Sequence, residues 1–137
     1  MMKKLSHIGI AVRDLRTSVE IFAKLFGRPP AGSENVADQK VNIAFFHLPN
    51  LSVELTEPAS ADSVIARFIE KRGEGIHHLS FEVDDIDAEI QRLKAAGFQL
   101  IDEKPRKGAD GCLVAFLHPK STNGVLIELS QKASISL

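Results

Sequence analysis

Apolar and polar positions along this chain follow two different periods. In Leu5–Val12 the aliphatic residues recur at every second position, which predicts a strand with one buried face. In Leu15–Phe26 apolar residues recur at i, i+4, i+7 and i+11, which predicts a helix with one apolar face. Asp14, just before this helix, suits an N-cap, and Gly27, just after it, suits a left-handed C-cap.

The same strand and helix pattern recurs 71 residues further along the chain. Ser6–Leu15 aligns with His77–Ile86, and Asp85 and Gly97 again mark the ends of the helix. Two further strands joined by a turn follow in each repeat, at residues 44–46 and 51–55, and at residues 115–117 and 125–129. Another strand is expected directly after each helix, near residues 30–34 and near residues 98–103, and the second of these is the better supported.

This order predicts an α+β fold with two tandem βαβββ modules, at about residues 5–58 and 76–131. A connecting helix is expected at about residues 60–73, because Ile65, Phe68 and Ile69 share one face and a Gly73-Glu74-Gly75 run ends it. At 137 residues the chain is long enough for one core, so we expect a single domain spanning residues 1–137.

Composition narrows the function classes. The 17 Lys and Arg against 18 Asp and Glu give a net charge of −1, so nucleic acid and anionic membranes are not expected partners. The apolar stretch Ile8–Val12 is too short for a signal peptide or a membrane span, so a cytoplasmic protein is expected. Cys112, the only cysteine, has no partner for a disulfide or a thiolate metal site.

Four predicted strands each place one potential metal ligand on the face opposite their aliphatic residues. By strand alternation these ligands are His7, Glu54, His78 and Glu128. His7 and Glu54 are 47 residues apart and His78 and Glu128 are 50 apart, a difference that fits the longer second turn. A single His or Glu on a strand is usually structural or solvent-facing, but the repetition on one face of both halves favours a metal site.

Two imidazoles and two carboxylates suit a divalent ion such as Co²⁺, Ni²⁺, Mn²⁺, Fe²⁺ or Zn²⁺. Four protein ligands leave two positions open on an octahedral ion, which suits a substrate with two nearby oxygens and a developing enolate charge. The remaining histidines fit ordinary roles. His77 points the opposite way from His78, and His47 and His118 lie at strand ends beside turns.

The paired His strands, each with a Glu on the last strand of its half, resemble the vicinal oxygen chelate superfamily. That superfamily includes glyoxalase I, extradiol dioxygenases, antibiotic-resistance proteins and methylmalonyl-CoA epimerases. The resemblance covers Leu5–Gln131, and within the superfamily the chain looks most like the epimerases. The most specific segments are Leu51–Pro58, Gly75–Ile86, Phe116–Lys120 and Gly124–Leu129.

The resemblance implies a cupped sheet around one metal ion held by His7, Glu54, His78 and Glu128. Cobalt is the expected ion, with Mn²⁺, Ni²⁺ and Zn²⁺ as alternatives. The implied reaction interconverts (R)- and (S)-methylmalonyl-CoA by removing the α-proton and returning it to the other face. Glu128 and Glu54 are the implied bases, an acyl-CoA is the implied substrate, and a homodimer is the implied assembly.

Two features keep alternatives open. Some epimerases carry another Glu on the strand that here reads Val41-Asn42-Ile43, and the aligned position in this chain is Ile43. Glu at position 54 is shared with glyoxalase I, so a lactoylglutathione lyase acting on the hemithioacetal of methylglyoxal and glutathione is an alternative. A metal-free small-molecule binding protein of the same fold is a second alternative, although such proteins generally lack the full ligand set that is present here.

Overall fold

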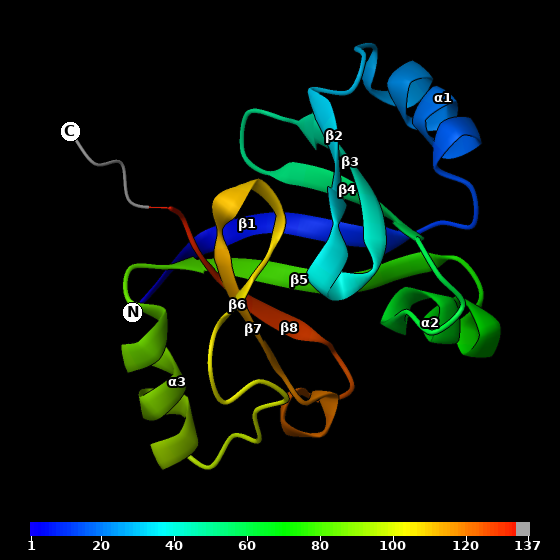
Figure 1. Ribbon diagram of the computed structural model, residues 1–137. Coiled ribbons are helices and arrows are strands. Elements are labelled where there is room, and N and C mark those ends of the chain that lie inside the picture. Colours follow the sequence, from blue (N-terminus) through cyan, green and yellow to red (C-terminus); the bar gives the residue numbers. More distant parts are fainter. Residues whose placement is uncertain (134–137) are drawn as a thin grey trace. The chain divides into compact units, whose positions relative to one another are not determined.

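The computed structural model describes residues 1–133 and contains the expected mixture of helices and strands (Figure 1). The α-helices are α1 (Leu15–Phe26), α2 (Val64–Arg72) and α3 (Ile86–Ala95). The strands are β1 (Met2–Ala11), β2 (Gly32–Val36), β3 (Val41–His47), β4 (Ser52–Pro58), β5 (Gly75–Val83), β6 (Arg106–Lys107), β7 (Leu113–Leu117) and β8 (Ile127–Gln131). The predicted α+β class and the doubled βαβββ order are therefore confirmed.

Contacts divide the chain into two compact units. The first unit comprises His7–His77 and contains α1, α2 and strands β2 to β4, with the second half of β1. The second unit comprises Met1–Ser6 together with the chain from His78 onward, so the division falls within β1 and within β5. No helix in the described part of the chain is long and apolar enough to cross a membrane.

In the first unit the strand order is β2-β3-β4-β1, with β4 and β1 parallel and the other pairs antiparallel. Helix α1 covers one face of this sheet, and in Figure 1 it lies beside the cyan strands. Its apolar stripe, including Val19 and Phe22, packs against buried Phe46 and Leu55. The aliphatic residues of each strand therefore face the helix and leave the alternate residues for the opposite face.

The second unit repeats this arrangement. Its strand order is β5-β8-β7-β6, with β5 and β8 parallel and the other pairs antiparallel. Helix α3 covers one face, where Ile86 and Ile90 pack against Val83 and Leu129. In both units the first strand thus pairs in parallel with the last strand, the pairing expected of a βαβββ repeat.

Local signals fixed the helix ends. Asp14 and Asp85 each accept a hydrogen bond from the backbone three residues later, as N-caps do. Gly27 ends α1 in the left-handed conformation, at φ 69°. At α3 the cap is Ala96 in a right-handed conformation, and Gly97 follows it with φ 94°, one residue later than in α1.

Of the two strands expected directly after the helices, the one judged better supported, near residues 98–103, was wrong. The segment near residues 30–34 does form a strand, Gly32–Val36, whereas residues 98–103 form only one isolated bridge, between Leu100 and Leu117. The second unit takes its extra strand from Arg106–Lys107 instead. Phe98 and Leu100 look like strand residues because they pack on the α3 core from a loop.

Candidate functional site

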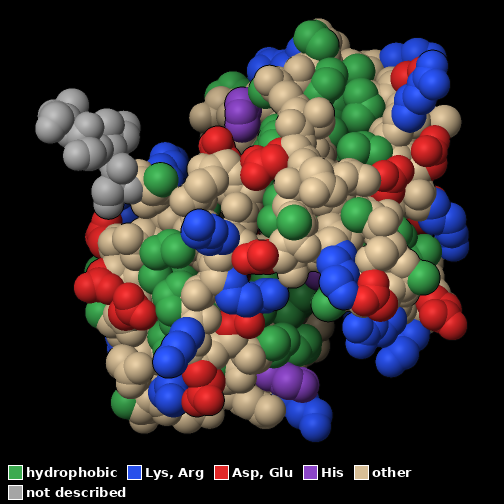
Figure 2. All heavy atoms as spheres, viewed as in Figure 1, with side chains coloured by type: hydrophobic (Ala, Val, Ile, Leu, Met, Phe, Trp, Pro, Cys, Tyr) green, Lys and Arg blue, Asp and Glu red, His purple; other side chains and the backbone are tan. Residues whose placement is uncertain are grey.

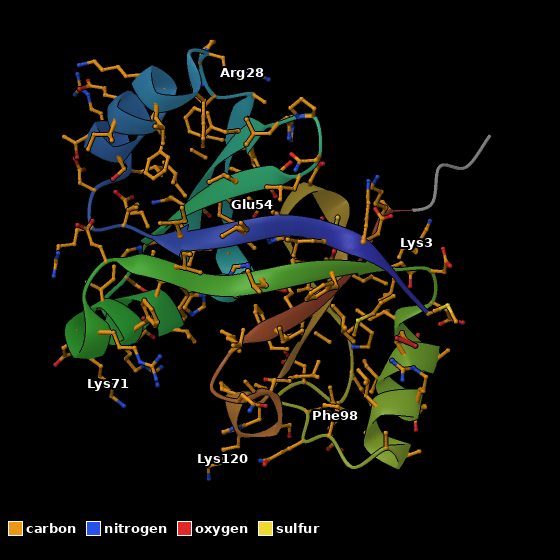
Figure 3. All side chains as sticks on the ribbon, turned by 180° about the vertical axis from the view of Figure 1, so that it is seen from behind. Lys3, Arg28, Glu54, Lys71, Phe98 and Lys120 are labelled. Atoms are coloured by element: carbon orange, nitrogen blue, oxygen red, sulfur yellow. The ribbon has the colours of Figure 1, made fainter. Side chains whose placement is uncertain are left out.

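Buried His7 and partly buried Glu54 form a pair in the first unit. Glu54 lies on β4 opposite Gly9 of β1, two residues beyond His7, and Figure 3 labels it beside that strand. His7 Nδ1 and Glu54 Oε2 are 3.1 Å apart, and the two side chains are only 10% and 12% exposed. The structure thus brings together the two ligands that were predicted for the first repeat.

His78 and Glu128 form the corresponding pair in the second unit. Glu128 lies on β8 opposite Ser80 of β5, two residues beyond His78. His78 Nε2 and Glu128 Oε1 are 4.0 Å apart, and their side chains are 9% and 5% exposed. The ring of Phe116 stands edge-on to the His78 ring, with centroids 5.6 Å apart. The second predicted pair is therefore also buried, with a wider separation than the first.

Further polar residues are buried on the same face of β5 as His78. Ser80 and Glu82 are 0% and 6% exposed. Burial alone would raise the pKa of Glu82, but hydrogen bonding and charge from Lys132, helped by nearby lysines including Lys3, hold that pKa below its usual value. Lys132 Nζ lies 3.2 Å and Lys3 Nζ 3.7 Å from the Glu82 carboxylate. Sequence alternation places both residues on this face, but only the packing shows that they are enclosed.

Each unit ties its helix to the strand that carries its glutamate, through an anchor that the sequence analysis missed. Glu57, three residues after Glu54, accepts a hydrogen bond from Leu15 N at 2.7 Å. Gln131, three residues after Glu128, accepts one from Ile86 N at 2.8 Å. The equivalent spacing in both repeats was the signal that could have revealed this anchor.

The remaining histidines have the ordinary environments expected for them. His77 packs edge-on against Phe68 of α2, with ring centroids 4.9 Å apart. His47 is exposed, and its Nδ1 lies 2.7 Å from the Ser52 hydroxyl. His118 accepts a hydrogen bond from Lys120 N and caps the short 3₁₀ helix Pro119–Thr122.

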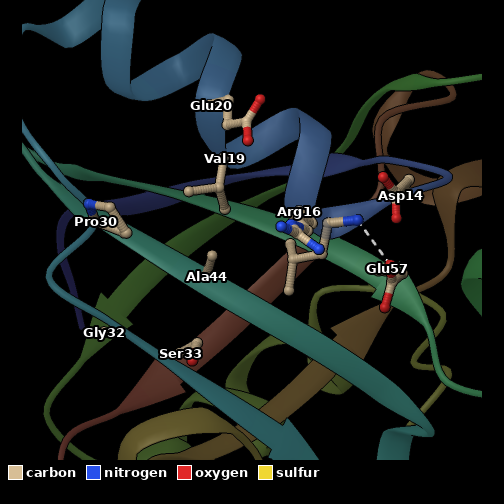
Figure 4. Close-up of a pocket in the computed structure, with 10 residues that line it drawn as sticks. Asp14, Arg16, Val19, Glu20, Pro30, Gly32, Ser33, Ala44 and Glu57 are labelled. Atoms are coloured by element: carbon tan, nitrogen blue, oxygen red, sulfur yellow. Dashed lines mark hydrogen bonds between the residues drawn. The ribbon is translucent and has the colours of Figure 1, made fainter.

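A surface hollow of about 630 Å³ lies in the first unit between the start of α1 and strands β2 and β3 (Figure 4). Ala44 and Glu57 line it, together with Arg16 and Ser33. In the strand register Phe45, not Ala44, lies opposite Glu54. The hollow is therefore on the helix side of the sheet, away from the face that carries His7 and Glu54.

The donor chemistry of the two pairs fits a divalent metal ion. Each pair offers one imidazole nitrogen and one carboxylate from a buried position on a strand. Figure 2 shows Lys and Arg interspersed with Asp and Glu over the face it presents, in keeping with the net charge of −1.

The sequence model of the Glyoxalase/Bleomycin resistance protein/Dioxygenase superfamily matches residues 6–116, and the chain belongs to this superfamily. Its similarity to particular members is high. The ethylmalonyl-CoA/methylmalonyl-CoA epimerase of Cereibacter sphaeroides is 41% identical over 133 residues, which cover 96% of this chain and 99% of that protein.

Solved structures show the same similarity. The crystal structure of methylmalonyl-CoA epimerase from Mycobacterium tuberculosis is 37% identical with a TM-score of 0.92, covering 97% of this chain and 90% of that one. A methylmalonyl-CoA epimerase in complex with methylmalonyl-CoA and NH₄⁺ is 32% identical with a TM-score of 0.94, covering 99% of each chain. The resemblance inferred from the sequence is therefore confirmed.

Proposed function

We propose that this protein is a methylmalonyl-CoA epimerase, which interconverts the (R) and (S) forms of its acyl-CoA substrate. The observation that carries the proposal is the buried His–Glu pair that each repeat provides at equivalent strand positions. The near full-length similarity to an ethylmalonyl-CoA/methylmalonyl-CoA epimerase supports the substrate class. Ethylmalonyl-CoA, one methylene larger, is therefore a second substrate to assay.

We infer that His7, Glu54, His78 and Glu128 together hold one divalent metal ion, with Co²⁺ as the expected ion. When bound, such an ion supplies Lewis-acid stabilisation of negative charge on the substrate oxygens. The burial of His7, His78 and Glu128, with Glu54 only 12% exposed, favours this role, because a site with little water strengthens the interaction between ligands and ion.

Glu128 and Glu54 are the proposed bases, one for each face of the α-carbon. One carboxylate removes the α-proton and the other returns a proton on the opposite face, which inverts the configuration. Strand β3 contains no acidic residue, and Ile43, which faces the same side as Glu54, is 4% exposed. Strand β3 thus supplies no further base, and proton transfer is assigned to Glu54 and Glu128.

The decisive test is exchange of the C2 proton of methylmalonyl-CoA in D₂O, followed by NMR with added Co²⁺ and with a chelator. We expect fast exchange with net epimerisation, and loss of both when the chelator removes the metal. Folded, metal-loaded protein that shows no exchange would refute the epimerase, and the methylglyoxal–glutathione hemithioacetal would then be assayed. Metal stoichiometry near zero with no effect of Co²⁺ would favour the metal-free binding protein.

The role of Glu128 as a base is tested with Glu128→Gln. We expect proton exchange to be lost while the metal is retained. Glu89→Gln is the control, because Glu89 is equally buried in the same unit but lies on helix α3. Unchanged turnover in Glu128→Gln would contradict the dual role of Glu128 as ligand and base.

A homodimer and a cytoplasmic location are further proposals, the first checked by light scattering and the second by fractionation of the native host.

A further inference from the structure

The two glutamates of the proposed site have different neighbours in the strand register. In the first unit Glu54 of β4 pairs with Gly9 of β1. In the second unit Glu128 of β8 pairs with Ser80 of β5. Gly9 and Ser80 occupy equivalent positions in the 71-residue repeat. On the parallel neighbour strand, the repeat therefore places a serine hydroxyl beside Glu128 and a glycine beside Glu54.

The Ser80 hydroxyl is enclosed and unpaired. Ser80 is 0% exposed, and among residues 1–133 its Oγ has no hydrogen-bond partner. Buried hydroxyls are nearly always hydrogen-bonded, because an unpaired one has lost its water without compensation. A hydroxyl left in this state points to a partner that comes within reach in another state of the protein.

Glu128 is the partner that the geometry favours. Neighbouring strands lie about 4.8 Å apart, so the in-register side chains of Ser80 and Glu128 stand side by side on one face. A glutamate side chain is long enough to bring a carboxylate oxygen to the serine by a rotamer change. Glu82, which lies on the same face of β5, already interacts with Lys3 and Lys132.

We propose that Ser80 is a positioning residue, whose hydroxyl donates a hydrogen bond to the Glu128 carboxylate when Glu128 takes up its role in catalysis. The inference rests on the proposed function. The bond occupies one carboxylate oxygen and fixes the direction of the other. The residue that corresponds to Ser80 in the first repeat is Gly9, beside Glu54, so the two glutamates have different neighbours despite the repeat.

The test compares Ser80→Ala with Ser130→Ala. Ser130 is the matched control, because it is also a buried serine, lies on β8 and pairs with Glu82. For Ser80→Ala we expect kcat to fall about tenfold with KM within about twofold, because Ser80 acts on Glu128 and makes no contact with the substrate. We expect affinity for Co²⁺, measured by titration, to fall about tenfold, as when a residue that supports a metal ligand is lost.

The melting temperature of the metal-free protein separates positioning from a structural role. Because the hydroxyl is unpaired, metal-free Ser80→Ala should melt no lower than the unaltered protein, and Ser130→Ala should keep kcat within about twofold. A loss of more than about 3 °C in Tm for Ser80→Ala would assign the hydroxyl a structural role and overturn the proposal. Unchanged kcat and unchanged Co²⁺ affinity would also overturn it.

This design separates the failure of the proposal from the failure of the proposed function. If the unaltered protein binds Co²⁺ but does not epimerise methylmalonyl-CoA, the epimerase assignment fails alone. The Co²⁺ titration of Ser80→Ala then decides the positioning role without any activity measurement, since an unchanged affinity would overturn it and a weakened affinity would support it.

Discussion

Replacement of Glu57 by alanine should destabilise the first unit by removing the anchor of α1. The Glu57 carboxylate accepts hydrogen bonds from Leu15 N at 2.7 Å and from Asn42 Nδ2 at 3.1 Å. Hydrogen bonds to a charged group contribute about 1.5–3 kcal/mol, and partial exposure of this site favours the low end. Loss of a negative charge at the start of a helix adds about 0.3–1 kcal/mol. The expected loss for Glu57→Ala is therefore about 2 kcal/mol.

The second unit supplies the matched control. There Gln131 makes the same bond to Ile86 N with a neutral amide, at 2.8 Å. Glu57→Gln should therefore keep the bond to Leu15 and lose only about 0.5 kcal/mol, mainly the interaction of the charge with the helix dipole.

Urea unfolding at pH 7 measures both variants. With slopes of about 1–3 kcal/mol per M, a loss of 2 kcal/mol lowers the midpoint by about 1 M, and the slope itself should not change. Equal losses for alanine and glutamine would refute the argument, because the bond geometry would then not matter. A loss below about 0.5 kcal/mol for Glu57→Ala would refute it as well.

Three further predictions concern stability and metal binding. The carboxylate of Glu89, which is 2% exposed, accepts hydrogen bonds from Arg92 at 2.7 and 3.0 Å, and this interaction lowers the pKa of Glu89. The ionised carboxylate therefore stabilises the folded protein above the unfolded pKa, and this stabilisation is lost as pH falls through the folded pKa. Glu89→Gln should thus lower the free energy of unfolding by about 1.5–2 kcal/mol at pH 7, measured with urea, and by much less at pH 3. The exposed control Asp87→Asn should change it little. Equal losses for Glu89→Gln at both pH values would contradict this prediction. Gly27→Ala should lose about 1 kcal/mol in the same assay because φ is 69°, and an unchanged midpoint would show that α1 can end without a left-handed residue. Chelator treatment should lower Tm by several degrees, and Co²⁺ should restore it, in calorimetry; an unaffected Tm would argue against metal binding to the folded state.

The sequence carried enough information for the elements that follow local rules. Helices α1 and α3 show an apolar stripe and an Asp N-cap, and both were predicted close to their observed bounds. The placement of each His–Glu pair followed from strand alternation, because a side chain between two core-facing aliphatic residues must point to the other face. A single His–Glu pair would have indicated little, but its recurrence in both repeats favoured the hypothesis of a metal site.

Features that depend on packing were not predictable in this way. Strand β2 has the sequence Gly-Ser-Glu-Asn-Val, with no apolar alternation, and is held by its ladder with β3. The loop around Phe98 and Leu100 is apolar because it covers the α3 core. The alternation of these apolar residues in the sequence is therefore the same as that of a strand. The unpaired state of the Ser80 hydroxyl is likewise a property of its surroundings and leaves no trace in the local sequence.

The membership of Met1–Ser6 in the second unit has a consequence for how the chain folds during synthesis. These residues precede His7–His77 in the chain, yet the rest of their unit begins at His78. At about 5–20 residues per second, synthesis of the intervening His7–His77 takes about 4–14 s, so this unit is complete on the ribosome before the partners of Met1–Ser6 are made. Until the residues from His78 onward are made, the nascent chain therefore carries Met1–Ser6 without the rest of their unit.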